Sequence, residues 1–261
     1  MSTEDDPVRA LHNAVASSVN QAEASTRPAW TTDGELRRMV VDVLRKLEID
    51  DTTSVIEIGC GVGALAVPIA HRAARFVGVD FAEQALAVLA DRFDAEGVAD
   101  RTKLVCLDLL QASDRELAGL GAFDRVLVYA TLHYIADERE LDRFLNRTLA
   151  LLVPGGLALF GSVPLEELRA HGDGPVPRGL TWKASAVGYR AVRRLARLVR
   201  RTPPFRTAEL LAGTTLALSA SMLEERLTGR ADVAGHHWLA PRVGTPLFSR
   251  RGDLVVRKRE P

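Results

Sequence analysis

The sequence predicts an α/β fold in which helices cover both faces of a mostly parallel β-sheet. Two observations carry this prediction. Short apolar runs alternate with helix-length stretches between residues 36 and 162. The runs are continuously apolar rather than alternating with polar residues, as is typical of strands that are buried on both faces. This alternation implies βαβ crossovers, and therefore a three-layer sandwich.

The elements follow one another in strict order. A helix is expected from Asp33, because apolar residues recur at helical spacing as far as Leu47, and the polar residues 50–53 end it. The expected strands are 55–58, 76–79, 103–107, 123–129 and 157–161, and the expected helices between them are 65–73, 82–96, 114–118 and 138–152.

The alternation stops after Val163. Prolines and glycines crowd residues 164–181, an arginine-rich helix is expected over 186–201, and Pro203 and Pro204 end it. A second helix is expected over 208–228, followed by a turn-rich stretch and a closing strand at 253–256. We therefore divide the chain into an N-terminal cap segment (1–35), an α/β core (36–163), a helical insertion or cap (164–245) and a terminal strand that returns to the sheet (246–261).

Composition excludes several protein classes. The chain is 47% hydrophobic and 26% charged, as in ordinary globular proteins. The uncharged run 148–165 contains Pro154 and two glycines, so no membrane span is expected. The acidic start MSTEDD is unlike a secretory leader, which predicts a cytoplasmic location. Two cysteines, Cys60 and Cys106, support neither a disulfide framework nor a structural metal site.

Charge is divided unevenly along the chain. Residues 1–160 carry 16 basic and 25 acidic side chains, and residues 161–261 carry 18 and 9. The arginines of 186–201 fall on one face of the expected helix. That face either meets solvent and the acidic part of the chain, or recruits an anionic or carrier-bound acceptor. Nucleic acid is not expected as a partner, because aromatic residues are not interleaved as in a stacking platform.

The most informative stretch is VIEIGCGVGALA, residues 55–66. Gly59, Gly61 and Gly63 allow the backbone to turn sharply and to approach a ligand, and the following helix offers its N-terminal amides. Taken alone, such a loop can also be a tight turn without a ligand.

Two acids strengthen the prediction of a ligand site. Asp80 ends the second strand, 21 residues past Gly59, and Asp108 ends the third. Ligands of doubly wound sheets bind at the carboxyl ends of strands, where an acid at the position of Asp80 accepts hydrogen bonds from ribose hydroxyls. Either acid by itself could instead cap a helix.

The class of ligand depends on Glu57. Gly59, Gly61 and Ala64 satisfy the dinucleotide pattern G-x-G-x-x-A, which leaves an NAD(P) oxidoreductase open. Glu57 lies two residues before the first glycine, where it would repel a phosphate and attract an ammonium or sulfonium group. The loop therefore favours a cationic ligand.

Five blocks in register resemble the class I S-adenosylmethionine-dependent methyltransferases. They read EIGCGVG (57–63), VGVD (77–80), LD (107–108), FD leading to ATLHY (123–134) and LVPGG (152–156), and the resemblance covers about residues 36–162. It implies a Rossmann-like sandwich with an antiparallel last strand. It also implies S-adenosyl-L-methionine as cofactor and S-adenosyl-L-homocysteine as product.

The resemblance implies a role for each block. The three glycines would line the methionine portion of the cofactor, Asp80 would hold the ribose, Asp108 would accept from the adenine amine, and the backbone at Tyr129 and Ala130 would meet the methionine amino group. With their neighbours, the expected cofactor-binding residues are Glu57, Gly59, Cys60, Gly61, Gly63, Asp80, Phe81, Asp108, Leu109, Tyr129 and Ala130.

Methyl transfer is an in-line displacement that depends chiefly on positioning. If the acceptor is a hydroxyl, His133 is the candidate base, with Tyr134 beside it. Many relatives carry a second histidine at the position of Tyr134, so His133 as part of the family framework stays open. Trp30, Trp182 and His237 are candidate acceptor-binding residues.

The predicted function is methyl transfer from S-adenosylmethionine to oxygen or nitrogen of a small molecule. A non-catalytic S-adenosylmethionine-binding partner subunit and an NAD(P) oxidoreductase are the alternatives.

Overall fold

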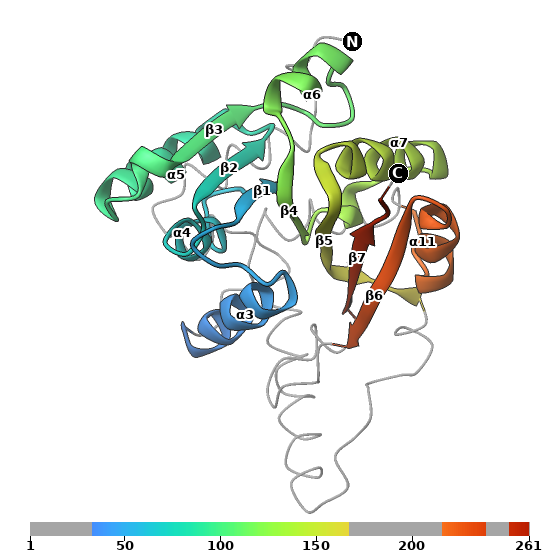
Figure 1. Cartoon of the computed structure of the whole chain (residues 1–261). Coiled ribbons are helices and arrows are strands. Elements are labelled where there is room, and N and C mark those ends of the chain that lie inside the picture. Colours follow the sequence, from blue (N-terminus) through green and yellow to red (C-terminus); the bar gives the residue numbers. More distant parts are fainter. Residues whose placement is uncertain (1–32, 167–215, 239–250, 261) are drawn as a thin grey trace, which may run out of the picture.

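A computed structural model describes residues 33–166, 216–238 and 251–260. These residues form a seven-stranded sheet in the order β3-β2-β1-β4-β5-β7-β6, with helices on both faces (Figure 1). The strands are β1 (Ser54–Ile58), β2 (Arg75–Asp80), β3 (Thr102–Cys106), β4 (Phe123–Tyr129), β5 (Leu152–Pro164), β6 (Ala231–Trp238) and β7 (Arg251–Lys258). Strands β1 to β5 pair in parallel, and β7 runs antiparallel to both β5 and β6.

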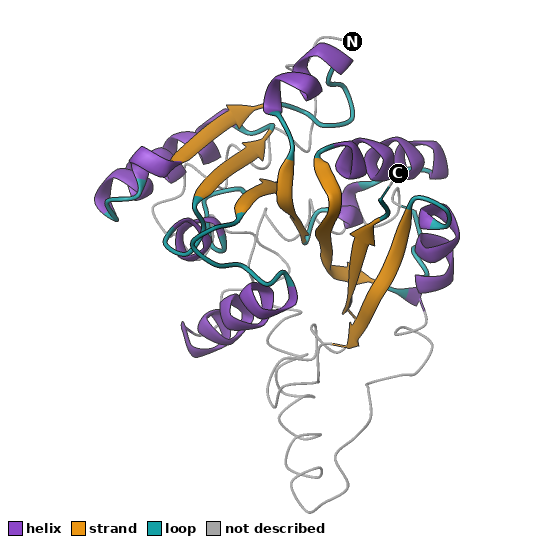
Figure 2. Cartoon of the chain, viewed as in Figure 1, coloured by secondary structure: helices purple, strands orange, loops and turns teal. Residues whose placement is uncertain are grey.

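The helices lie on the two sides of this sheet (Figure 2). They are α3 (Asp33–Lys46), α4 (Ala66–Ala70), α5 (Glu83–Ala95), α6 (Asp114–Leu120), α7 (Glu138–Ala150) and α11 (Ala220–Leu227), with 3-10 turns η2 (Ala99–Arg101) and η3 (Leu132–Tyr134). Apolar residues of α3, α4 and α5 pack into one cluster, and those of α6, α7 and α11 into another.

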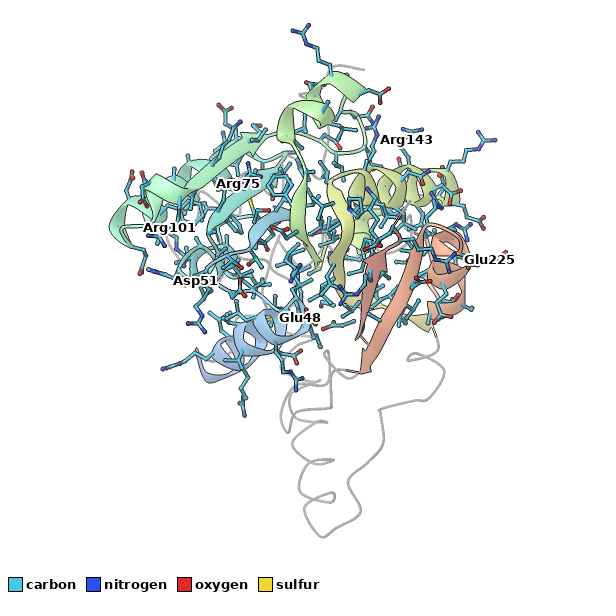
Figure 3. The ribbon with its side chains drawn as sticks, viewed as in Figure 1. Glu48, Asp51, Arg75, Arg101, Arg143 and Glu225 are labelled. Carbon is cyan, nitrogen blue, oxygen red and sulfur yellow. The ribbon has the colours of Figure 1, made fainter. Side chains whose placement is uncertain are left out.

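The central strands of the sheet are buried on both faces because successive strand residues point to opposite clusters. Val55 packs with the α3 side and Ile56 with the α7 side, and both are fully buried. On the α5 side, the rings of Phe76 and Phe93 meet edge to face at 5.8 Å. Charged side chains such as Asp51 lie around the outside (Figure 3).

The structure confirms the predicted fold class, the five parallel strands of the core and the antiparallel last strand. Two element boundaries differ from the predicted ones, because contacts with residues outside the element fix where it begins or ends. Strand β5 continues to Pro164, because β7 pairs along it as far as Arg251. The helix expected over 208–228 begins at Ala220 in the described part. Ser219 caps it by accepting a hydrogen bond from the N–H of Met222 at 3.0 Å, and Leu218 forms a bridge with Leu165.

One strand was not predicted. The turn-rich stretch inside the region expected as a cap, 164–245, contains β6, which pairs with β7 and therefore belongs to the sheet. Its pairing shifts register between Val233 and Gly235, so no regular strand pattern is visible in the sequence. The arginine-rich stretch 186–201 and residues 1–32 lie outside the described residues. Within the described ranges, no helix is long and apolar enough to cross a membrane.

Candidate functional site

The strand order reverses between β1 and β4. From β1 the chain proceeds outward through β2 and β3, and then returns to place β4 and β5 on the other side. Open α/β sheets bind ligands at such a switch point, outside the carboxyl ends of the strands. The glycine loop follows β1 at this place.

The loop is closed by packing at its two ends and is open in its middle. Gly59, Gly61 and Gly63 have φ angles of +77°, +51° and +86°, a left-handed backbone that favours glycine. A Cβ at Gly59 would lie 2.5 Å from the hydroxyl oxygen of Thr131, and one at Gly63 would collide with Leu89. Around a Cβ at Gly61, no atom of the described residues lies within 4 Å. A ligand therefore has room beside Gly61.

Asp80 ties this loop to the end of β2. One carboxylate oxygen accepts from the N–H of Gly61 at 2.8 Å, and the other accepts from the N–H of Ala82 at 2.9 Å. Because each oxygen has a second lone pair, the carboxylate can accept further hydrogen bonds from ligand hydroxyls. The main chain links β3 to the same place, since the N–H of Leu107 donates to the carbonyl of Asp80 at 2.9 Å.

Asp108 and Leu109 follow β3. The carboxylate of Asp108 accepts from the N–H of Leu110 at 2.9 Å, which makes a local turn. The carbonyl of Leu109 accepts from the guanidinium of Arg147 on α7 at 2.5 Å. On the opposite side of the site, Arg92 of α5 donates to the carbonyl of Val62 in the glycine loop at 2.5 Å. Sequence reasoning missed both arginines, because nothing in their local pattern marks a loop carbonyl as their partner.

Glu57 is the unusual group of β1. It is buried, and its Oε2 atom has no hydrogen-bond partner in the part of the chain that the structure describes. Burial, and then the negative charge of Asp80, raise the pKa of Glu57 well above its usual range. The same two causes, with Glu57 itself, raise the pKa of the Cys60 thiol. A ligand that brings a cationic hydrogen-bond donor to this acid would satisfy it.

The end of β4 lies at the same edge of the sheet as the glycine loop. Ala130 has a φ of +54°, and its N–H donates to the carbonyl of Gly161 on β5 at 2.9 Å. The hydroxyl of Thr131 lies 3.3 Å from the carbonyl oxygens of both Ile58 and Tyr129. Thr131 thus joins the ends of β4 and β1, a role that the sequence analysis did not assign.

His133 and Tyr134 lie in η3, directly after this strand end. Their rings are 4.0 Å apart between centroids and inclined at 41°. Of the three residues that were expected to bind the acceptor, only His237 falls within the described ranges. His237 is next to last in β6, opposite Asp253 of β7, and hence at the same edge of the sheet. Trp30 and Trp182 lie outside the described residues.

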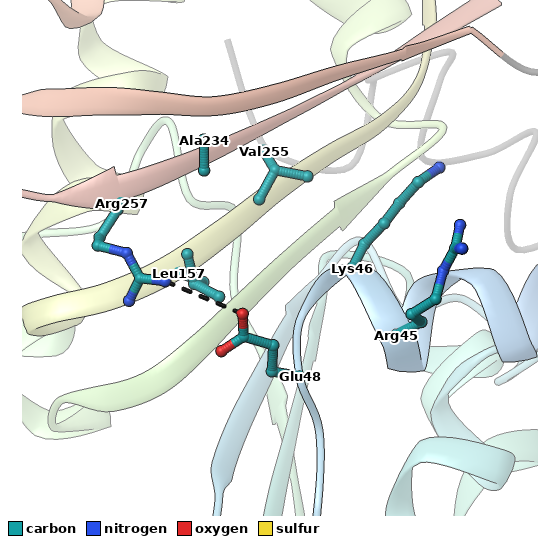
Figure 4. A pocket seen from close by; sticks show the side chains of 7 residues that line it. All are labelled: Arg45, Lys46, Glu48, Leu157, Ala234, Val255 and Arg257. Carbon is teal, nitrogen blue, oxygen red and sulfur yellow. Dashed lines mark ion pairs between the residues drawn. The ribbon is translucent and has the colours of Figure 1, made fainter.

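A hollow of about 410 Å³ lies away from the glycine loop, between the end of α3 and the strands β5, β7 and β6 (Figure 4). Its lining residues are Arg45, Lys46, Glu48, Leu157, Ala234, Val255 and Arg257. Across the described ranges, no group of three or more histidine, cysteine or acidic side chains is arranged to hold a metal ion.

Comparison with known proteins identifies the domain. A family described as a methyltransferase domain matches residues 56–158, which run from β1 through β5 and include the glycine loop, Asp80 and Asp108. Residues 56–158 therefore form a methyltransferase domain, in agreement with the resemblance of the sequence to the class I S-adenosylmethionine-dependent methyltransferases. S-adenosylmethionine is the cofactor of this domain type, which favours it over the dinucleotide that the glycine pattern had left open.

Curated relatives match parts of this chain. Nodulation protein S of Rhizobium tropici is 28% identical over 55% of this chain and 58% of its own length. The 23S rRNA (uracil(1939)-C(5))-methyltransferase RlmD of Bordetella pertussis is 29% identical over 46% of this chain and 24% of its own length. The chain therefore spans less than two thirds of these relatives.

Among solved structures, the N-methyltransferase NodS from Bradyrhizobium japonicum WM9 in complex with S-adenosyl-L-homocysteine has a similar fold. The TM-score is 0.63 at 16% identity, over 98% of this chain and all of that one. At this identity the likeness concerns the fold alone.

Proposed function

We propose that the chain transfers a methyl group from S-adenosylmethionine to a nitrogen or oxygen atom of a small molecule. One observation carries the proposal. Glu57, near the end of the strand that leads into the glycine loop, is a buried acid with an oxygen that has no partner among the described residues, and the loop has open space at Gly61. A buried acceptor of this kind is costly unless a ligand satisfies it. The amino group of the cofactor's methionine portion is such a ligand.

The residues at the strand ends divide the task of binding. Glu57 and the glycine loop would hold the methionine portion, together with the backbone at Tyr129 and Ala130. Asp80 would accept from the ribose hydroxyls, and Asp108 would accept from the adenine amine. When bound, S-adenosylmethionine supplies an electrophilic methyl group on a sulfonium sulfur.

The chemistry then depends on how the chain positions its acceptor. The acceptor atom must lie in line with the methyl group and the sulfur, so residues that orient it lower the barrier. His133 follows the carboxyl end of β4, where it would take the proton of a hydroxyl acceptor. A neutral amine needs no base for the attack itself, so a nitrogen acceptor would depend less on His133.

The names of two similar proteins bear on the acceptor, and one of them supports a nitrogen nucleophile. The Rhizobium tropici relative is named nodulation protein S, and the Bradyrhizobium japonicum structure is described as the N-methyltransferase NodS. The Bordetella relative, in contrast, is described as acting on ribosomal RNA. RNA therefore belongs in the test as a competing acceptor.

The test has two stages. Titration calorimetry should detect binding of S-adenosylhomocysteine and S-adenosylmethionine, and no binding of NADPH. Small amines and alcohols, and a ribosomal RNA fragment, are then incubated with S-adenosylmethionine and examined for a mass increase of one methyl group. Methylation of a small molecule supports the proposal. Binding of NADPH alone, methylation of the RNA alone, or cofactor binding without transfer to any acceptor would each contradict it, the last in favour of a non-catalytic partner subunit.

A further inference from the structure

Three neighbouring strands have a left-handed residue at or near their carboxyl ends, at the same edge of the sheet. Gly59 follows β1 with φ +77°, Ala130 follows β4 with φ +54°, and Ser162 lies near the end of β5 with φ +57°. Two of the three carry side chains, for which this conformation is unfavourable. Such residues persist when the surroundings hold them, and they gather at binding and catalytic sites.

The bend at Ser162 is held by an acid from another strand. Pairing between β5 and β7 shifts register between Phe160 and Val163, so the bend interrupts the ladder. The N–H of Ser162 donates instead to one carboxylate oxygen of Asp253 on β7, at 2.8 Å. Asp253 thereby replaces the backbone acceptor that a regular strand would supply.

Asp253 is itself held by a buried lysine. Its second oxygen accepts from the ammonium of Lys46 at 2.8 Å, and the two side chains are 0% and 4% exposed. Lys46 ends α3 and also pairs with Asp42 one turn earlier. Burial raises the pKa of Asp253 and the ammonium of Lys46 opposes this rise, so the pair is the main support of the buried charge.

The contacts continue from this pair to the glycine loop. The residue before Ser162 is Gly161, whose carbonyl accepts from the N–H of Ala130 at 2.9 Å. After Ala130, the hydroxyl of Thr131 lies 3.3 Å from the carbonyl of Ile58, the last residue before Gly59. Hydrogen bonds and peptide links therefore connect Lys46 on α3 with the start of the glycine loop.

We propose that Lys46 and Asp253 are positioning residues of the methyl-transfer site, which act by holding the bends at Ser162 and Ala130. This inference rests on the proposed function, because Ala130 lies where that function places the methionine portion of the cofactor. The two residues need not touch the cofactor. They keep the edge formed by β1, β4 and β5 in the shape that the cofactor meets.

The experiment compares Lys46→Met with a control variant, a double variant and the conservative variant Lys46→Arg. Arg257→Met is the control, because Arg257 lines the same hollow beside α3, donates to the carbonyl of Gly155 and forms an ion pair with Glu48 rather than with Asp253 (Figure 4). The double variant Lys46→Met/Asp253→Asn removes both charges and leaves an amide oxygen that can accept from Ser162. Each protein is examined for S-adenosylhomocysteine affinity, unfolding temperature, and amide hydrogen exchange at Ser162 and Ala130.

Lys46→Met should weaken S-adenosylhomocysteine binding by about fivefold or more, within the range measured for coupling through a network of contacts. The amides of Ser162 and Ala130 should exchange faster than in the wild type. The double variant should bind more tightly than Lys46→Met, and Lys46→Arg should restore most of the affinity. Arg257→Met should stay within about twofold of the wild type.

A merely structural pair would behave differently. In that case Lys46→Met lowers the unfolding temperature, yet binds S-adenosylhomocysteine as tightly as Arg257→Met and exchanges Ala130 at the wild-type rate, which overturns the inference. If Lys46→Met does not fold, the double variant and Lys46→Arg are compared by the same measurements. Absence of S-adenosylhomocysteine binding by the wild type would overturn the proposed function instead. In that case, unchanged amide exchange at Ala130 in Lys46→Met would still count against the positioning role.

Discussion

The carboxylate of Asp80 accepts a hydrogen bond from the backbone N–H of Gly61 at 2.8 Å, so the acid that ends β2 holds the glycine loop that follows β1. Removal of this carboxylate should disturb the loop as well as remove a ribose acceptor. We expect Asp80→Ala to weaken S-adenosylhomocysteine binding by about 10- to 150-fold, the equivalent of one hydrogen bond to a charged group. Calorimetry gives the affinity, and Asp94→Ala, on the exposed side of α5, is the control. Equal affinities of these two variants would be inconsistent with the assigned site.

The open space at Gly61 leads to a second prediction. Gly61→Val should abolish S-adenosylhomocysteine binding, because the branched side chain would occupy the space beside the loop. Gly97→Val is a matched control, since Gly97 also has a positive φ, +66°, and open surroundings among the described residues, but lies in the turn after α5. Both substitutions should cost about 1–2 kcal/mol of stability through backbone strain. Only the first should affect binding, as measured by calorimetry and thermal unfolding.

Glu57 should make stability depend on pH. Its pKa is raised in the folded protein, so its contribution to stability is fully present below the ordinary value of 4.5 and is lost as pH rises through the folded pKa. Relative to Glu57→Gln, the wild type should therefore lose stability above about pH 4.5, at up to about 1.4 kcal/mol per pH unit until the folded pKa is passed.

Urea unfolding of both proteins between pH 5 and pH 8 measures this difference. The variant Glu225→Gln, at an exposed position of α11, should follow the wild type over the whole range. Parallel curves for the wild type and Glu57→Gln would mean that Glu57 titrates alike in the folded and unfolded chains.

His133 is tested once an acceptor is identified. If His133 is the base for a hydroxyl acceptor, His133→Ala should lower kcat by about 100-fold or more and leave S-adenosylhomocysteine affinity nearly unchanged. His71, which is exposed and lies 3.3 Å from Glu96 outside the site, serves as the control. A decrease in kcat of less than about fivefold would assign His133 to the framework, with catalysis by positioning alone.

Elements with local signals in the sequence could be predicted without the structure. Residues 36–162 alternate between buried strands and amphipathic helices, and periodicity within each segment is enough to recognise them. The glycine loop, Asp80 and Asp108 could be predicted to lie at one edge of the sheet because each follows a strand, and parallel strands end at a common edge. Recognition of these features required no knowledge of contacts between distant residues.

Contacts between residues that are far apart in the sequence could be seen only in the folded structure. Strand β6 was not predicted because its ladder is supplied by β7 and its own pattern is interrupted at Gly235. Thr131 resembles any polar residue after a strand until Gly59 is seen beside it. Lys46 and Asp253 are 207 residues apart, and each alone is typical of a surface position. Burial makes them a pair, because a charge removed from water requires a partner that only folding brings near.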